Sequence, residues 1–218
     1  MYQSRFKFFF RVDGGNVYSL GMGHIYRCLK IADFLAAEKQ IKSTFIMKNI
    51  RSGVQKVAEM GHSTLLLSED MDEETEISHL EEICRDQTLI IDIRNIRNNY
   101  FLRLNKSVKK TIYFDDLGNN NYTPHYLVNP SVIADLQKYK KYNSTTKYLV
   151  GEKYFILGGH GFKSKSVVNK SINKVFVSMG GADPANYTPS VLKLLAELPN
   201  NFKTTLVLGP AFNNFEEV

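Results

Sequence analysis

A histidine follows directly after two closely spaced glycines, where an irregular segment changes to a helical pattern. The segment reads SLGMGHIYRCLKIADFL and spans residues 19–35. Gly21 and Gly23 let the backbone approach a ligand closely, and His24 falls in the first helical turn, where the helix dipole disfavours a charged imidazolium. A neutral imidazole can act as a general base near neutral pH. The pattern therefore predicts a catalytic base, and the alternative is that His24 only caps the helix and fills a gap in the packing.

An arginine lies one turn further along the same expected helix. Arg27 shares a helix face with His24, because residues three apart are neighbours on a helix, and its guanidinium could hold an anionic part of a substrate or fix the loop. Asp13 or another nearby carboxylate could orient the His24 ring. The glycines do not complete the dinucleotide fingerprint G-x-G-x-x-G, since Tyr26 occupies the third glycine position, and no P-loop lysine follows them. The segment thus indicates a base and an anion site rather than a dinucleotide site.

Short apolar runs alternate with helical patterns in the first part of the chain. Strands are predicted at residues 6–12, 43–47, 63–67, 88–93, 110–114 and 125–129, and helices at residues 24–37, 55–60 and 73–85. Near-continuous apolar strands separated by helices are typical of a parallel sheet covered on both faces. The fold class is therefore α/β and Rossmann-like. The loop at residues 13–23 follows the first strand, at the edge of the sheet where such proteins bind ligands.

Two adjacent carboxylates, Asp115 and Asp116, follow the strand expected at residues 110–114. They could bind a metal or act as an acid and a base, but neighbouring side chains on an extended chain point in opposite directions. We favour the interpretation that they organise the turn through hydrogen bonds to its backbone, with one of them lining a cleft. The remaining histidines lack a metal-ligand spacing and are treated as surface or packing residues. Neither a metal nor a cofactor is predicted.

The α/β pattern starts again near the end of the chain. Residues 173–184 read as a strand that runs into a glycine loop, and a helix is expected at residues 187–198 and a strand at residues 204–210. Gly180 and Gly181 could offer backbone N–H groups to a phosphate, with Asp183 as the helix cap and Pro184 as the first helical residue; the alternative is ordinary turn chemistry. The predicted domains are residues 1–162, a linker at 163–171 and a second domain at 172–218. A single β-α-β unit is short for a domain, so we expect the chain to be a fragment of a longer protein.

The composition limits the possible partners and the compartment. The chain has 218 residues and a hydrophobic content of 43%. Its net charge of +6 favours anionic partners in general, such as nucleotides, sugar phosphates, nucleic acids or acidic lipids, and does not choose among them. No nucleic-acid-binding signature and no membrane-span-length apolar run are present. Cys28 and Cys84 form no zinc or redox motif, and the N-terminus lacks a signal-peptide pattern. A cytoplasmic, reducing location is therefore expected.

The motifs also resemble a known family. The opening pattern R-x-D, then G-x-G-H-x-x-R-C-L, is followed by LIIDI, YFDDLGN, LVNP, YLVGEKYFIL and FVSMGGADPAN in the same order as in the nucleotide-sugar hydrolases of pseudaminic acid biosynthesis. Spore-coat polysaccharide biosynthesis proteins belong to the same wider family. The chain departs from this family at residues 158–161, where Gly-Gly-His-Gly replaces an arginine followed by an acidic residue.

The resemblance implies a glycosyltransferase-B-like fold, in which two α/β domains face a cleft and the second holds most of the nucleotide. It makes His24 the catalytic base that activates water at the anomeric carbon and releases UDP from a UDP-sugar. The same resemblance, with the strand-end positions, gives the substrate-binding set Arg11, Asp13, Gly21, Gly23, Arg27, Asp92, Asp115 and Asn129, and the nucleotide-binding pair Gly180 and Gly181. A UDP-sugar hydrolase is the first hypothesis. A glycosyltransferase of the same fold, or a nucleotide-sugar-binding module that needs a further segment or partner, is the alternative.

Overall fold

The chain forms two compact units in the computed structural model. One comprises Met1–Asp13 and Gly23–Gly158, and the other comprises Gly14–Met22 and Gly159–Val218. The structure describes residues 7–16, 20–118, 121–134, 139, 145–157, 171–199 and 201–218. Almost all of the linker expected at residues 163–171, and the Gly-Gly-His-Gly segment, lie outside the described residues.

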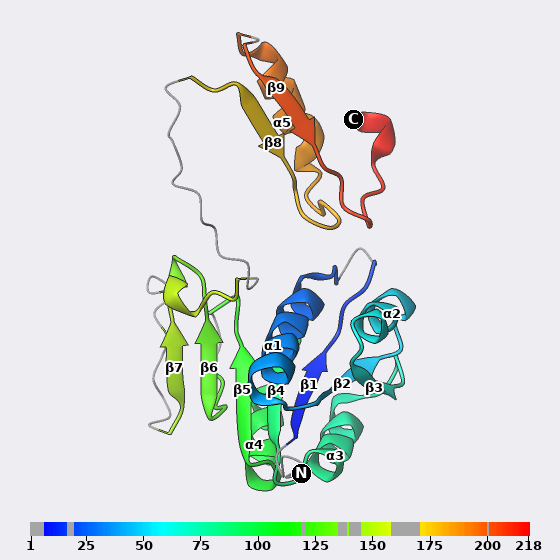
Figure 1. The fold of residues 1–218 in the computed structure, drawn as a ribbon, viewed down its shortest axis with the longest axis vertical. Helices are drawn as coiled ribbons and strands as arrows, with labels where there is room; N and C mark the ends of the chain where they lie inside the picture. The colour runs from blue at the N-terminus through cyan, green and yellow to red at the C-terminus, as the bar shows by residue number, and fades with distance from the viewer. Residues whose placement is uncertain are drawn as a thin grey trace. The chain divides into compact units, whose positions relative to one another are not determined.

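The first unit is built on a seven-stranded parallel sheet in the order β3-β2-β1-β4-β5-β6-β7 (Figure 1). The strands are β1 (Phe8–Val12), β2 (Ser43–Lys48), β3 (Ser63–Leu67), β4 (Thr88–Asp92), β5 (Lys110–Phe114), β6 (Tyr126–Asn129) and β7 (Lys147–Val150). The predicted α/β class and parallel sheet are confirmed. The six predicted strands are all present, and the seventh, β7, was not expected. It pairs with β6 at the edge of the sheet, and its four residues, KYLV, are too short a run to carry a strong strand signal.

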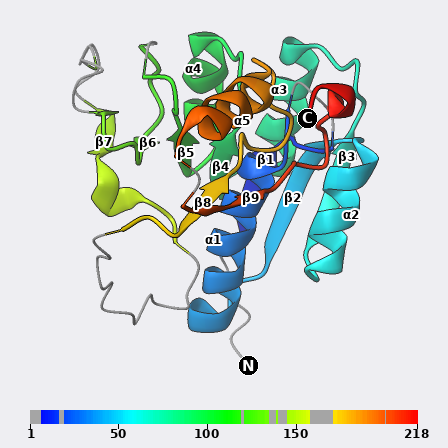
Figure 2. The same cartoon turned by 90° about the horizontal axis from the view of Figure 1, so that it is seen from above.

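Four helices cover the sheet. They are α1 (Gly23–Lys39), α2 (Arg51–Glu59), α3 (Glu73–Ile83) and α4 (Asn98–Ser107). Figure 2 shows α1 and α2 on one side of the sheet and α3 and α4 on the other. Helix α4 was not expected from the sequence; it begins after Arg97, which provides no side-chain cap. No helix among the described residues is long and apolar enough to cross a membrane.

The core forms because strand side chains alternate between the two helical layers. Phe10 faces one layer and stacks on Phe45 of the neighbouring strand, with ring centroids 4.9 Å apart. Phe9 faces the other layer and joins a buried cluster that includes Tyr100 and Phe101 of α4. Burial on both faces is what parallel strands require, and it fixes the strand ends on which the candidate site depends.

The second unit contains β8 (Lys174–Val177), α5 (Tyr187–Glu197) and β9 (Lys203–Leu206), and the two strands are parallel. Gly180 follows β8 in a left-handed conformation, with φ at 78°. The backbone carbonyls of Gly180 and Gly181 approach Gly209 so closely that a Cβ atom on Gly209 would overlap them. Glycine at position 209 is therefore required by the close packing of the two loops.

The expected cap of the last helix is partly wrong. Helix α5 begins at Tyr187 rather than Pro184, because Asn186 is left-handed, with φ at 52°, and cannot continue a helix backwards. The carboxylate of Asp183 nevertheless accepts hydrogen bonds from the backbone N–H groups of Tyr187 and Thr188, at 2.9 and 2.8 Å. Asp183 thus provides hydrogen-bond acceptors for the first backbone N–H groups of α5, although it lies four residues before the helix begins.

Candidate active site

The site lies where the strand order of the first unit reverses direction. Strands β2 and β3 extend from one side of β1, and β4 to β7 extend from the other. In open parallel sheets, ligands bind at the carboxyl ends of the strands at this switch point. Helix α1 begins with Gly23 and His24, and β4 ends with Asp92, so His24 and Asp92 come from the two elements that flank the reversal.

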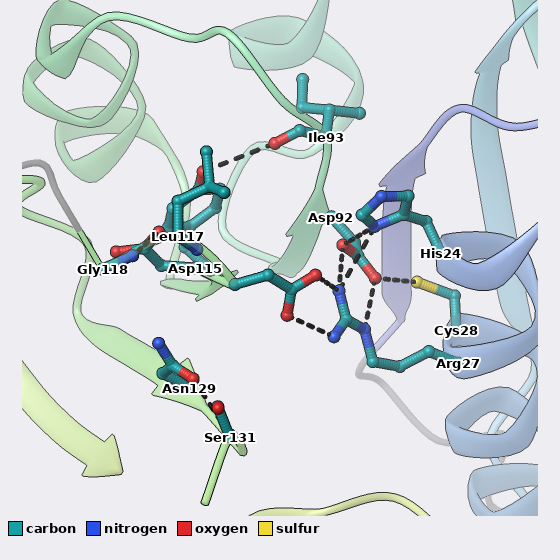
Figure 3. Close-up of polar contacts among 12 residues, drawn as sticks. His24, Arg27, Cys28, Asp92, Ile93, Asp115, Leu117, Gly118, Asn129 and Ser131 are labelled. Carbon is teal, nitrogen blue, oxygen red and sulfur yellow. Dashed lines mark hydrogen bonds and ion pairs between the residues drawn. The ribbon is translucent and has the colours of Figure 1, made fainter. Parts of the chain in front are cut away.

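Asp92 holds the imidazole of His24. The Nδ1 atom of His24 lies 2.7 Å from Oδ1 of Asp92, and the two side chains are 11% and 1% exposed. Figure 3 shows His24, Arg27 and Cys28 converging on this carboxylate. Because the carboxylate accepts a hydrogen bond at Nδ1, we assign the proton of the neutral ring to that atom, which leaves Nε2 as the basic nitrogen. Asp92, rather than Asp13, is therefore the carboxylate that orients His24.

Arg27 binds two carboxylates at once. Its Nε and one terminal nitrogen donate to Asp92 at 2.8 and 2.7 Å, and both terminal nitrogens donate to Asp116 at 2.7 and 2.9 Å. Its guanidinium carbon also lies over the Phe114 ring, 4.6 Å from the centroid. The structure thus places Arg27 in an internal network, whereas the sequence suggested a contact with an anionic substrate.

The network keeps Asp92 ionised in spite of its burial. Burial alone would raise the pKa of Asp92, but hydrogen bonds from His24 and Arg27 outweigh it, and the pKa is lowered overall. The thiol of Cys28 lies 3.7 Å from Oδ2 of the same carboxylate, and burial together with this negative charge raises its pKa well above the ordinary value. Asp92 is therefore a carboxylate and Cys28 a neutral thiol at neutral pH.

The adjacent carboxylates Asp115 and Asp116 have different environments. Oδ1 of Asp115 accepts hydrogen bonds from the backbone N–H groups of Leu117 and Gly118, at 3.2 and 3.0 Å, which is the turn role favoured from the sequence. Oδ2 of Asp115 is buried and has no hydrogen-bond partner among the described residues. Burial raises the pKa of Asp115. Asp116 instead faces Arg27, and the sequence analysis did not place it in the site.

Asn129, at the end of β6, is fully buried. Its amide donates to the hydroxyl of Tyr139 at 2.7 Å, and its Oδ1 accepts from the backbone N–H of Ser131 at 3.0 Å. The Tyr139 hydroxyl in turn donates to the backbone carbonyl of Asp115, at 3.3 Å. These contacts support the loop after β5, and a substrate contact by Asn129 stays a prediction.

Arg11 and Asp13 occupy the end of β1 but turn toward other partners. Arg11 is 1% exposed and donates to both oxygens of Glu76 at 2.7 and 3.0 Å, while Asp13 accepts from Arg11 and from the backbone N–H of Lys48, each at 2.8 Å. Tyr100 completes the cluster by donating to Glu76 at 2.6 Å. This geometry favours a structural role for Arg11, in contrast to the substrate contact that the sequence suggested.

The glycines of the candidate site have distinct roles. Gly21 has a positive φ of 64°, and its carbonyl accepts a hydrogen bond from Gly15 at 2.9 Å, which closes the loop. Gly23 is the first residue of α1, and a Cβ atom there would meet nothing within 4 Å. Gly180 and Gly181 belong to the second unit, and their role in holding a nucleotide stays a prediction.

Three ligand atoms of the site have a spacing that could suit a metal ion. They belong to His24, Asp92 and Asp116 and lie within 4.8 Å of one another. The guanidinium of Arg27 already binds both carboxylates, so a metal ion would have to displace a positive charge that is held by four hydrogen bonds. The donor set present is therefore suited to an internal arginine rather than to a cation site.

A pocket of the first unit opens beside His24. Its lining residues are His24, Ile93, Arg94, Asn95, Tyr113, Phe114, Asp115, Asp116, Leu117 and Tyr122. The loop after β4, which supplies Arg94 and Asn95, was not singled out from the sequence. The only signal available was its position directly after the Asp92 strand end.

The chain has an α/β fold that is similar to the glycosyltransferase-B fold. The crystal structure of MurG from Acinetobacter baumannii supports this fold, with a TM-score of 0.55 over 93% of this chain and 67% of that chain, at 7% sequence identity. The uncharacterized protein MJ1062 of Methanocaldococcus jannaschii is 28% identical over 215 residues, which are 95% of this chain. The chain spans only 43% of the length of that relative. No protein-family model matches the chain.

Proposed function

We propose that the protein processes a nucleotide-sugar, with His24 as the general base and UDP as the released product. The observation that carries this proposal is the pairing of His24 with the buried Asp92 at 2.7 Å, at the ligand-binding edge of a glycosyltransferase-B-like sheet. The finer assignment, a hydrolase of pseudaminic acid biosynthesis, rests on the resemblance of the sequence motifs.

The proposed reaction begins with proton removal at Nε2 of His24. As that nitrogen takes a proton from water, the water oxygen forms a bond to the anomeric carbon, and the bond from that carbon to the phosphate oxygen breaks. UDP leaves with the bonding electron pair, and it is a good leaving group, so activation of the nucleophile is the main task of the protein. Asp92 stabilises the imidazolium through Nδ1 once it has formed.

Arg27 and Asp116 have a positioning role in this proposal. The guanidinium binds Asp92 through two nitrogens and fixes the orientation of its carboxylate, and Asp116 holds the guanidinium in place through its terminal nitrogens. The carboxylate can then hold the His24 ring in one orientation. Asp115, Asn129 and the glycine pair Gly180 and Gly181 stay candidates for contacts with the sugar and the nucleotide.

Glycosyl transfer is the second candidate, because the fold is shared with MurG. Only the nucleophile differs: a sugar hydroxyl would take the place of water, and His24 would remove its proton in the same way. A third outcome is a binding module that holds the nucleotide-sugar without turnover. The three are separated by the fate of the nucleotide in the presence and absence of an acceptor.

The test uses the full-length natural protein and a panel of UDP-sugars, with UDP release followed with and without acceptor sugars. Release without an acceptor identifies a hydrolase, and release only with an acceptor identifies a transferase. His24→Asn should lower kcat by about 10²–10⁴-fold, the range typical for loss of a positioned base, while UDP binding is retained. The matched control is His79→Asn, since His79 is exposed on α3 and contacts the backbone carbonyl of Thr75. Near-normal turnover by His24→Asn would leave His24 as a packing residue at the start of the helix.

A further inference from the structure

The surroundings of His24 carry an excess of negative charge. Asp92 and Asp116 contribute two carboxylates, and Arg27 contributes the one guanidinium that both of them bind. A phosphate that approached this cluster would therefore meet one uncompensated negative charge. Because all the nitrogens of Arg27 already donate to carboxylates, this arginine has little left to offer an anion.

One positive side chain of the pocket is not committed to such a network. Arg94 is the only lysine or arginine among the residues that line the pocket beside His24. It is exposed, and its side chain makes no hydrogen bond or ion pair with any other residue that the structure describes. Its guanidinium is therefore available to a ligand in this pocket.

The backbone around Arg94 is fixed on both sides. The hydroxyl of Tyr113 donates to the carbonyl of Ile93 at 3.4 Å, and the hydroxyl of Tyr122 donates to the carbonyl of Ile96 at 3.0 Å. Ile96 is buried, and Asn95 turns the chain in a left-handed conformation, with φ at 60°. The loop thus holds the backbone of Arg94 beside the pocket and leaves its side chain unpaired.

We propose that Arg94 binds the phosphate that is bonded to the anomeric carbon of the substrate. This inference rests on the proposed function, in which His24 activates the nucleophile at that carbon. The planar guanidinium matches the oxygens of a phosphate with two parallel hydrogen bonds. Negative charge on this phosphate grows as the bond to the sugar breaks, so the contact becomes stronger in the transition state and increases the rate as well as the affinity.

The neighbouring Asp115 lines the same pocket. Burial raises the pKa of its carboxyl group. Its buried Oδ2 lacks a partner among the described residues and suits a sugar hydroxyl. The pocket would then take the sugar on the Asp115 side and the phosphate on the Arg94 side.

The first experiment compares Arg94→Gln, Arg94→Lys and Arg85→Gln in the full-length protein by steady-state UDP release. Arg94→Gln should lower kcat/KM by about 10- to 100-fold, the effect of losing a charge-assisted hydrogen bond, and should lower kcat as well. Arg94→Lys should recover part of the loss, because it keeps the charge but not the fork. Arg85 is the matched control, since it is exposed and precedes the first residue of β4, whereas Arg94 follows the last residue of that strand. Unchanged kinetics of Arg94→Gln in an active protein would overturn the role of Arg94 and leave the proposed function intact.

The second experiment does not depend on turnover. The Nε–Hε signals of the arginines are followed by NMR in ¹⁵N-labelled protein while inorganic pyrophosphate is added, and the Arg94 signal is identified by its loss in Arg94→Gln. A saturable shift of this signal, with the Arg85 signal unmoved, supports the phosphate contact. If the shift is seen but no UDP-sugar is turned over, the proposed function alone fails. In an active protein, pyrophosphate is added up to about 20-fold above the concentration of UDP that saturates the protein; in an inactive one, it is added up to about 10 mM. If the Arg94 signal does not shift over this range, the inference is overturned.

Discussion

The substitution Asp92→Asn tests whether the carboxylate network holds the site together. Oδ1 of Asp92 accepts from His24 and from a terminal nitrogen of Arg27, and Oδ2 accepts from Nε of Arg27. An asparagine has nearly the same shape but only one acceptor oxygen and two donor hydrogens. Because Arg27 presents two donors side by side, any orientation of the amide leaves one donor facing another.

The expected loss of stability follows from the burial of the pair. Asp92 is 1% exposed, and breaking a buried ion pair by removing one partner costs about 3–5 kcal/mol. Arg27 stays paired with Asp116, so we expect a value near the lower end, about 3 kcal/mol. The control Asp116→Asn removes a partner that is 39% exposed, and a loss of about 1 kcal/mol or less is expected for it, as for other exposed ion pairs.

Urea unfolding followed by circular dichroism gives both values, and its pH dependence identifies the cause. The pKa of Asp92 is lowered in the folded protein, so its contribution is fully present above the ordinary aspartate pKa of about 3.9. It is lost as the pH falls through the lower, folded value. The stability difference between the natural protein and Asp92→Asn should therefore be largest near neutral pH and shrink below about pH 4. Equal losses for Asp92→Asn and Asp116→Asn, or a difference that does not change with pH, would refute this account of the network.

Three further outcomes are expected. Arg27→Ala should lower the free energy of unfolding by about 3 kcal/mol or more, because it leaves the buried Asp92 without its main partner, and this is measured by the same urea titration. Glu76→Gln should cost about 3–5 kcal/mol by removing the negative partner of the buried Arg11, and a loss below 1 kcal/mol would contradict the structural role of Arg11. A thiol reagent at pH 8 should modify neither cysteine until the protein is unfolded in urea, because burial raises the pKa of Cys84 to about 12 and that of Cys28 well above its ordinary value.

The elements that could be predicted from sequence are those whose apolar pattern is decided by the core. The FFFRV strand and the TLIID strand pair in register over five residues, and both are buried runs that a parallel sheet requires. Strand β7 and helix α4 were missed for the opposite reason. Strand β7 is a short edge strand with no fully buried residue, and helix α4 starts without a capping side chain, so neither carries a strong local signal.

The candidate site was predictable only as far as strand ends and helix starts can be located. His24, Arg27 and Asp92 were expected together because parallel strands bring their carboxyl ends to one edge, and the structure joins them by direct hydrogen bonds. Which partner each side chain takes could not be predicted, because that depends on the rotamers and the loop geometry. Asp116 reaches Arg27 because the chain turns after Asp115. Neighbouring side chains point in opposite directions on an extended chain, but this does not hold in a turn.

The planar fork of Arg27 explains how the His24 ring is held in one orientation. Helix α1 is tied to the ends of β4 and β5 through this one guanidinium, which binds Asp92 and Asp116 along its edges and lies over Phe114 with its face. A lysine could not make these contacts, because it has no planar face and no paired donors. A rotation of the His24 ring away from Asp92 would remove a hydrogen bond to a carboxylate whose position is already set by Arg27, so the ring is oriented before any ligand arrives. Arg94 lies outside this network, so in our proposal the orientation of His24 and the binding of an anion depend on two different arginines.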